Sequence, residues 1–131
     1  MTTASVTHPS SLWDNPLGTD GFEFVEHTSK HPQALVALFE RLGFTAVAKH
    51  RSKNVTLYRQ GGINFILNAE PNSQAARFAE SHGPSANAMA FRVRDAAKAF
   101  KALVAGGAKR SNSARGPWSC TFRRLKASAD R

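Results

Sequence analysis

The order of the predicted elements constrains the fold of this chain more than any single motif does. Residues 21–27 alternate apolar and acidic side chains, which is typical of a strand with one face in a core. A helical pattern follows over 29–43. Three more strands are then expected at 44–49, 55–59 and 63–68. The order β-α-β-β-β defines a first module over residues 21–69.

The predicted first helix has clear start and stop signals. Ser29 is the expected N-cap, Pro32 falls in the first turn, and Gly43 follows the last turn. The apolar stripe of this helix consists of Leu35, Leu38, Phe39 and Leu42. Gly61-Gly62 predicts a turn between the third and fourth strands, because its spacing fits neither a dinucleotide motif nor a P-loop.

The same order begins again further along the chain. Residues 72–82 predict a connecting helix capped by Asn72 or Ser73, which Gly83-Pro84 ends. A fifth strand is expected at 88–93, followed by a helix that Asp95 caps. This partial second module spans 88–107, and no pattern for three further strands follows it. The sequence thus predicts an α+β domain over residues 21–107, after a flexible lead-in over 1–20.

Residues 108–131 differ from the rest of the chain in both charge and pattern. They hold seven Lys and Arg against one Asp, whereas the other 107 residues hold 11 basic and 8 acidic side chains. No apolar period runs through them, so we expect this tail to be disordered. The formal charge of +9 is therefore concentrated in the tail, which weakens the case for a specific nucleic-acid partner.

Bulk features favour an intracellular protein without a membrane span. Cys120 is the single cysteine, which excludes an internal disulfide and suits a reducing compartment. The first twenty residues lack the apolar segment of a secretory signal, and no apolar run is long enough to cross a bilayer. We expect a cytoplasmic location.

Long stretches of the chain resemble one enzyme family. The stretches GFEFVEH (21–27), HRSKNVTLYRQGGINFILNAEPNS (50–73) and HGPSANAMAFRVRD (82–95) resemble the N-terminal domain of bacterial 4-hydroxyphenylpyruvate dioxygenases. The lead-in 12–24 is similar too, so the resemblance covers about residues 12–107. A β-α-β-β-β module followed by its repeat is also the layout of the vicinal oxygen chelate superfamily, which includes glyoxalase-like and bleomycin-resistance-like proteins.

The resemblance implies a relationship to tyrosine catabolism. Members of this family use Fe(II) and O₂ to convert 4-hydroxyphenylpyruvate to homogentisate and CO₂, and two His and one Glu of the C-terminal domain hold the iron. The N-terminal domain supports the fold and the subunit contacts of a homo-oligomer. We therefore expect an N-terminal fragment that is inactive alone and holds no cofactor, and whether it is itself an enzyme stays open.

The sequence of the tail predicts a shift of reading frame in the gene. WSCTFRRLKASAD (118–130) stands where the family continues with a segment like MELHIPAIKGIGG. Codons can be chosen for these 13 residues that encode the family segment when they are read one base earlier. The hypothesis is a shift upstream of Trp118, near Lys109, followed by a premature stop.

No residue is assigned a catalytic, cofactor-binding or metal-binding role. Metal-binding relatives of the fold place ligands in the first and fifth strands, where this chain has Phe24 and Ala88, neither of which can bind a metal. Cys120 lacks the setting of a nucleophile. The five histidines, none of which is assigned as a ligand, are His8, His27, His31, His50 and His82.

Three local features have more ordinary interpretations. His82 is expected at a helix end, with a contact to another domain or subunit as the alternative. The basic turn 51–54 is expected to be a solvated hairpin rather than a phosphate site, since neither a helix N-terminus nor a glycine nest accompanies it. Arg123, Arg124 and Lys126 near aromatic residues leave non-specific binding of single strands open.

Two other functions remain alternatives to the fragment. The first is a stand-alone small-molecule-binding protein of the vicinal oxygen chelate superfamily, which would need a complete second module or a domain-swapped partner. The second is a basic nucleic-acid-binding module, which a salt titration with an oligonucleotide would reveal.

Overall fold

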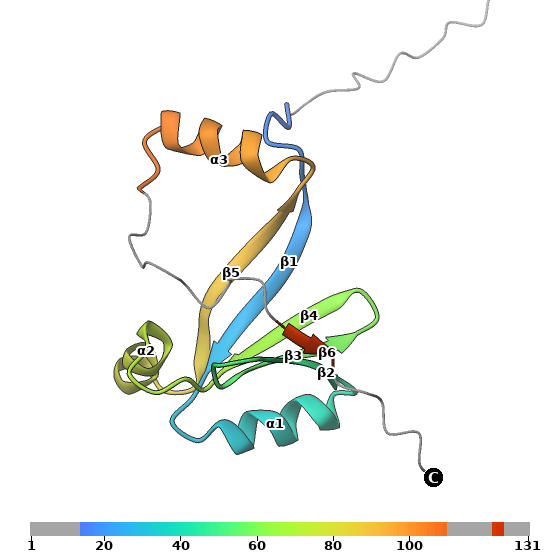
Figure 1. The fold of residues 1–131 in the computed structure, drawn as a ribbon, viewed down its shortest axis with the longest axis vertical. Coiled ribbons are helices and arrows are strands. Elements are labelled where there is room, and N and C mark those ends of the chain that lie inside the picture. Colours follow the sequence, from blue (N-terminus) through green and yellow to red (C-terminus); the bar gives the residue numbers. More distant parts are fainter. Residues whose placement is uncertain (1–13, 110–121, 125–131) are drawn as a thin grey trace, which may run out of the picture.

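The computed structural model describes residues 14–109 and 122–124. Along the chain, the helices and strands are β1 (Thr19–Thr28), α1 (Pro32–Arg41), β2 (Thr45–His50), β3 (Val55–Gln60), β4 (Ile63–Asn68), α2 (Gln74–His82), β5 (Ser85–Val93), α3 (Ala96–Ala105) and β6 (Phe122–Arg124). They form one sheet in the order β5-β1-β4-β3-β2-β6 (Figure 1). The predicted β-α-β-β-β module and the β-α start of a second module are confirmed.

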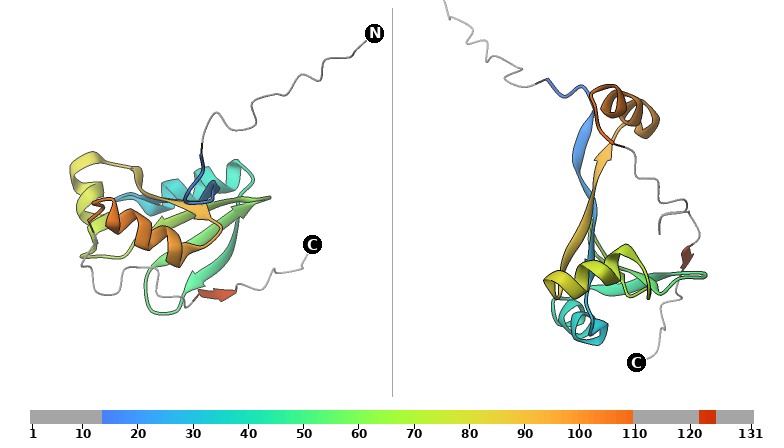
Figure 2. Two further views of the ribbon diagram at one scale, coloured as in Figure 1. Left: turned by 90° about the horizontal axis from the view of Figure 1, so that it is seen from above. Right: turned by 90° about the vertical axis from the view of Figure 1, so that its left-hand side faces the viewer.

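The sheet consists of two parts that meet at β1. The strands β2, β3 and β4 form an antiparallel meander, and β4 pairs in parallel with β1. On its other side, β1 pairs with β5 in antiparallel fashion. The β1–β5 ribbon extends away from the meander, and α3 lies across its far end (Figure 2). In the part of the chain that the structure describes, no helix is long and apolar enough to cross a membrane.

An aromatic cluster between α1 and the meander forms the core. Phe39 of α1 is 2 % exposed and packs with Phe44, Tyr58 and Leu67, with Phe65 against them. The rings of Phe44 and Phe65 stack at a centroid distance of 4.3 Å, and Phe39 contacts Tyr58 edge-on at 5.3 Å. Burial, together with the nearby Glu40 carboxylate, raises the pKa of Tyr58.

The N-terminus of α1 differs from the prediction. His31, not Ser29, is the N-cap residue, and it makes no side-chain capping hydrogen bond. The Ser29 hydroxyl instead accepts a hydrogen bond from the His31 backbone N–H at 3.0 Å, which closes a tight turn before the helix. Ser29 was a plausible cap because a serine hydroxyl accepts backbone N–H groups both at helix N-termini and in tight turns.

The apolar stripe of α1 is only partly buried. Phe39 and Leu35 face the core as predicted, and Val36 joins them. Leu38 and Leu42 are 46 % and 54 % exposed, so the core covers only part of the predicted apolar stripe. The sheet packs against one side of α1, where Leu35, Val36 and Phe39 lie. Leu38 and Leu42 lie outside this contact.

Most of the predicted caps and turns are present. Ser73 caps α2 by accepting the Ala76 N–H, and Asp95 caps α3 by accepting the Lys98 N–H. Gly43 follows α1 with φ +89°, a conformation that favours glycine. Gly61-Gly62 forms the turn between β3 and β4.

The tail contains a short strand that the sequence did not predict. Phe122–Arg124 forms β6, which pairs in antiparallel fashion with β2 and sets Arg123 opposite Lys49. The expectation of a wholly disordered tail therefore differs from the structure at these three residues. Backbone pairing to the free edge of β2 does not require an apolar period, so no sequence pattern marks it. The remainder of the tail, 110–121 and 125–131, lies outside the described residues.

Candidate functional site

A buried carboxyl group lies where three strands meet. Glu26 of β1 is 3 % exposed and sits between β5 and β4. Its Oε1 atom accepts a hydrogen bond from Asn68 Nδ2 of β4 at 3.1 Å and another from Asn87 Nδ2 of β5 at 2.7 Å. Glu26 Oε2 and Asn87 Oδ1 are buried without a hydrogen-bond partner in the described structure. A buried polar group with an unused acceptor is uncommon and marks the strongest candidate site in the chain.

The register of the β1–β5 pairing determines which residue lies opposite Glu26. Phe22 pairs with Phe91, but Phe24 pairs with Ala90, so β1 contains one extra residue between them. Glu26 lies opposite Ala88, whose small side chain leaves room for the carboxyl group. Glu26 lies two residues after Phe24 and three after Glu23, so it shares the face of Phe24 and lies on the opposite face from Glu23.

The chemistry of this site favours structural cross-linking over metal binding. Asn68 and Asn87 turn their NH₂ groups toward Glu26, and an NH₂ donor cannot coordinate a cation. Residues 14–109 and 122–124 contain no group of three or more His, Cys, Asp or Glu side chains that could hold a metal ion. The Fe(II) that the resemblance implies therefore does not fit the described residues of this chain, and no reaction step is assigned to it.

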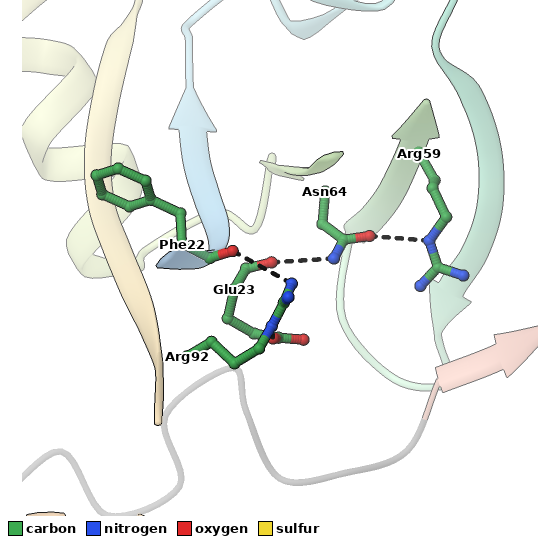
Figure 3. Close-up of polar contacts among 5 residues, drawn as sticks. All are labelled: Phe22, Glu23, Arg59, Asn64 and Arg92. Carbon is green, nitrogen blue, oxygen red and sulfur yellow. Dashed lines mark hydrogen bonds and ion pairs between the residues drawn. The ribbon is translucent and has the colours of Figure 1, made fainter. Parts of the chain in front are cut away.

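A second polar network crosses the same strands at the surface. Arg92 of β5 forms an ion pair with Glu23 of β1, with 2.8 Å between Nε and Oε2 (Figure 3). Asn64 of β4 donates to the Glu23 carbonyl at 2.9 Å and accepts from Arg59 of β3 at 2.8 Å. Because Glu23 and Arg92 are about half exposed, with side-chain values of 48 % and 46 %, water competes for this pair.

His27 points away from both networks and into the aromatic core. Its ring lies 5.2 Å from Phe39 and 4.7 Å from Phe65, edge-on to both. Its Nδ1 atom is buried and has no hydrogen-bond partner in the described structure. Burial lowers the pKa of His27, against a smaller upward effect of the Val25 backbone.

The histidines of the described residues lie in different surroundings. His31 is exposed at the start of α1, whereas His27 is enclosed by aromatic rings. The Nδ1 atom of His50 accepts hydrogen bonds from the Ser52 and Lys53 backbones, both at 3.2 Å, and so orders the basic turn 51–54. His82 is the last residue of α2 and packs on Phe78, which confirms the helix-end interpretation. His8 and Cys120 lie outside the described residues.

A surface cavity of about 410 Å³ lies between the start of α1, the end of β4 and α2, with Ser29, Lys30 and Glu70 in its lining. The Thr28 hydroxyl donates to the Ala75 carbonyl, and the Ser29 hydroxyl already accepts a backbone N–H. These two hydroxyl groups make hydrogen bonds within the chain, and they do not indicate a particular ligand.

The chain matches a known domain family over most of its length. The family is described as hydroxyphenylpyruvate dioxygenase, N-terminal, and the match covers residues 13–128. It runs through β6 and most of the segment from residue 108 onward. A tail translated out of frame is not expected to match the family this far along the chain. The frameshift therefore stays a prediction, and the DNA sequence is needed to test it.

Curated relatives and a solved structure agree with this family. Hemolysin VllY of Vibrio vulnificus is 57 % identical over 106 residues, which are 79 % of this chain and 30 % of the relative. A 4-hydroxyphenylpyruvate dioxygenase of a Pseudomonas species is 50 % identical over 117 residues, which are 89 % of this chain and 33 % of the relative. The chain thus spans about a third of these relatives.

The fold of a solved relative is also similar. The structure of a xylose isomerase-like TIM barrel/4-hydroxyphenylpyruvate dioxygenase fusion protein matches 88 % of this chain and 19 % of its own, with a TM-score of 0.67 and 40 % identity. This likeness confirms the α+β, vicinal oxygen chelate type of module. With the match to the family over residues 13–128, it establishes that the chain belongs to the hydroxyphenylpyruvate dioxygenase family and corresponds to its N-terminal domain.

Proposed function

We propose that this chain is the N-terminal part of a 4-hydroxyphenylpyruvate dioxygenase and that it has no dioxygenase activity alone. The observation that carries the proposal is the match of residues 13–128 to the N-terminal domain of this family, in a chain about a third as long as its curated relatives. The role of such a domain is to support a catalytic domain located elsewhere. A cytoplasmic location and a place in tyrosine catabolism belong to the same proposal.

The described residues support a scaffolding role. Glu26 and the Arg59–Asn64–Glu23–Arg92 network tie neighbouring strands together. Neither group combines a nucleophile, a base and an oxyanion donor in the way that a catalytic site requires.

A chimeric enzyme tests the proposal directly. Residues 12–107 of this chain would replace the corresponding segment of the Pseudomonas enzyme, and homogentisate would be measured with Fe(II), O₂ and 4-hydroxyphenylpyruvate. We expect the chimera to turn over substrate and the isolated chain not to. A chimera that folds and binds iron but makes no homogentisate, while the intact Pseudomonas enzyme does, would refute the assignment.

The reading-frame hypothesis needs a separate test. Sequencing the gene and the DNA downstream of it should reveal the missing domain in another frame. If no such domain is encoded there, the proposed frameshift fails, although the family assignment does not depend on it.

A further inference from the structure

The outer side of β2 is only partly paired in the described chain. One side of this six-residue strand pairs with β3. On the other side, β6 pairs with Ala48, Lys49 and His50 (Figure 1). No strand of the described chain pairs with residues 45–47 on that side. Unpaired backbone N–H and C=O groups of this kind can bind a further strand, and we call this side of the strand the β2 edge.

The pairing of β6 shows that the β2 edge accepts an antiparallel strand. This strand has only three residues, whereas strands in sheets usually contain about five or six. Its register sets Arg123 opposite Lys49. Like charges directly opposite each other weaken a strand pair. The strand β6 is therefore a short and poorly matched occupant of the β2 edge.

The sequence around the β2 edge is uniformly basic. Between Glu40 and Glu70 the chain contains five Lys and Arg residues and no Asp or Glu. These five residues are Arg41, Lys49, Arg51, Lys53 and Arg59. Lys49 is exposed and forms no ion pair within the part of the chain that the structure describes. The β2 edge thus carries a positive charge that no described acidic group pairs with.

A lysine on a strand edge selects among the strands that could pair there. It discourages neutral and basic strands, and it favours a strand with an acidic side chain directly opposite. Selection of this kind depends on repulsion of the wrong partner as well as attraction of the right one. An acidic segment in extended conformation would supply both the charge and the backbone groups that the β2 edge can bind.

We propose that the β2 edge is a strand-addition site for an extended acidic segment of a partner protein, which replaces β6 and sets an Asp or Glu opposite Lys49. Main-chain hydrogen bonds supply the affinity, and the charge of Lys49 supplies the selectivity. A nucleic acid is also attracted to this charge, but its phosphate backbone cannot continue the strand ladder. The proposal does not depend on the dioxygenase assignment, and β2 lies far from β5 in the strand order, so whatever covers the β1–β5 ribbon leaves the site open.

The binding of two synthetic peptides to the full chain tests the role of the charge. Each peptide is as long as β2 and alternates Thr and Val, with either Glu or Lys at the position opposite Lys49. Fluorescence anisotropy should show that the wild-type chain binds the Glu peptide about fivefold more tightly than the Lys peptide. Lys49→Glu should reverse this preference. Lys101→Glu makes the same change on α3 and is the matched control, which should keep the wild-type preference.

Two further measurements distinguish strand addition from simple attraction between charges. A Glu peptide that is N-methylated along its paired side keeps its charge but loses the backbone donors, so it should bind about tenfold more weakly. Amide hydrogen exchange of residues 45–50 in the wild-type chain should become slower when the unmodified Glu peptide is added, because the new strand protects the edge.

Several outcomes would overturn the proposal. A wild-type chain that does not bind the Glu peptide would do so, as would a Lys49→Glu variant with an unchanged preference. Equal binding of the methylated peptide would reduce the site to a charged surface and would also refute strand addition. Tighter binding of a short deoxythymidine strand than of the Glu peptide, at the same salt concentration, would assign the basic edge to nucleic acid instead. Circular dichroism verifies that both variants keep the fold.

Discussion

Replacing Glu26 with alanine should destabilise the fold more than any other single carboxylate replacement on β1. The substitution removes the acceptor that Asn68 and Asn87 share, at 3.1 and 2.7 Å, and leaves two amide donors without it. Each buried donor left unsatisfied costs about 1–3 kcal/mol. Removal of the unpartnered Oε2 atom offsets part of this cost. We therefore expect a loss of about 2–4 kcal/mol, a large share of the roughly 5–15 kcal/mol that stabilises a typical domain.

Glu23→Ala is the matched control, because it removes a carboxylate from the same strand. Its ion pair with Arg92 is about half exposed, so its loss should cost no more than about 1 kcal/mol. Urea unfolding followed by circular dichroism gives both free energies of unfolding. If Glu26→Ala costs no more than Glu23→Ala, the buried carboxyl does not hold the three strands together and the reasoning is wrong.

Three further substitutions test other parts of the structure. Burial lowers the pKa of His27, so the folded state disfavours its protonation, and the stability of the fold should decrease as the pH drops below about 6.5. Urea unfolding midpoints at neutral and acidic pH should show a smaller decrease for His27→Phe than for the wild-type chain. Gly43→Ala should lower the free energy of unfolding by about 1–2 kcal/mol, because φ is +89° and the new Cβ would lie 2.7 Å from Gln60 Nε2. In thermal melts of both variants, Gly61→Ala, at φ +55° with no atom near the new Cβ, should be the less destabilised. Ser73→Ala should lower stability by about 1 kcal/mol through loss of the α2 cap, and an unchanged midpoint would contradict that.

The elements with strong local signals could be predicted from the sequence. The caps Ser73 and Asp95 and the glycine after α1 depend on neighbours within a few residues, and all three occur where expected. The α1 N-cap was misplaced by two residues because Ser29 uses its hydroxyl in a turn instead. Such local alternatives cannot be separated without the backbone conformation.

The candidate site depends on contacts that are remote in sequence. Asn68 and Asn87 lie 42 and 61 residues from Glu26, so no local pattern could reveal them as its partners. One signal was present, since Glu26 stands two residues after Phe24 and shares its side of the strand. The partners that bury this face could not be read from β1 alone, because its pairing with β4 and β5 is visible only in the fold. The pairing of β6 with β2 depends in the same way on an edge that the tertiary fold creates.

The central claim is that this chain is the N-terminal part of a dioxygenase and is inactive alone. Its most direct test is the quantity of homogentisate formed by the purified full chain with Fe(II), O₂ and 4-hydroxyphenylpyruvate. We predict a yield equal to that of a control without protein, with the intact Pseudomonas enzyme as the positive reference. Homogentisate above that control, increasing with the amount of chain, would contradict the account.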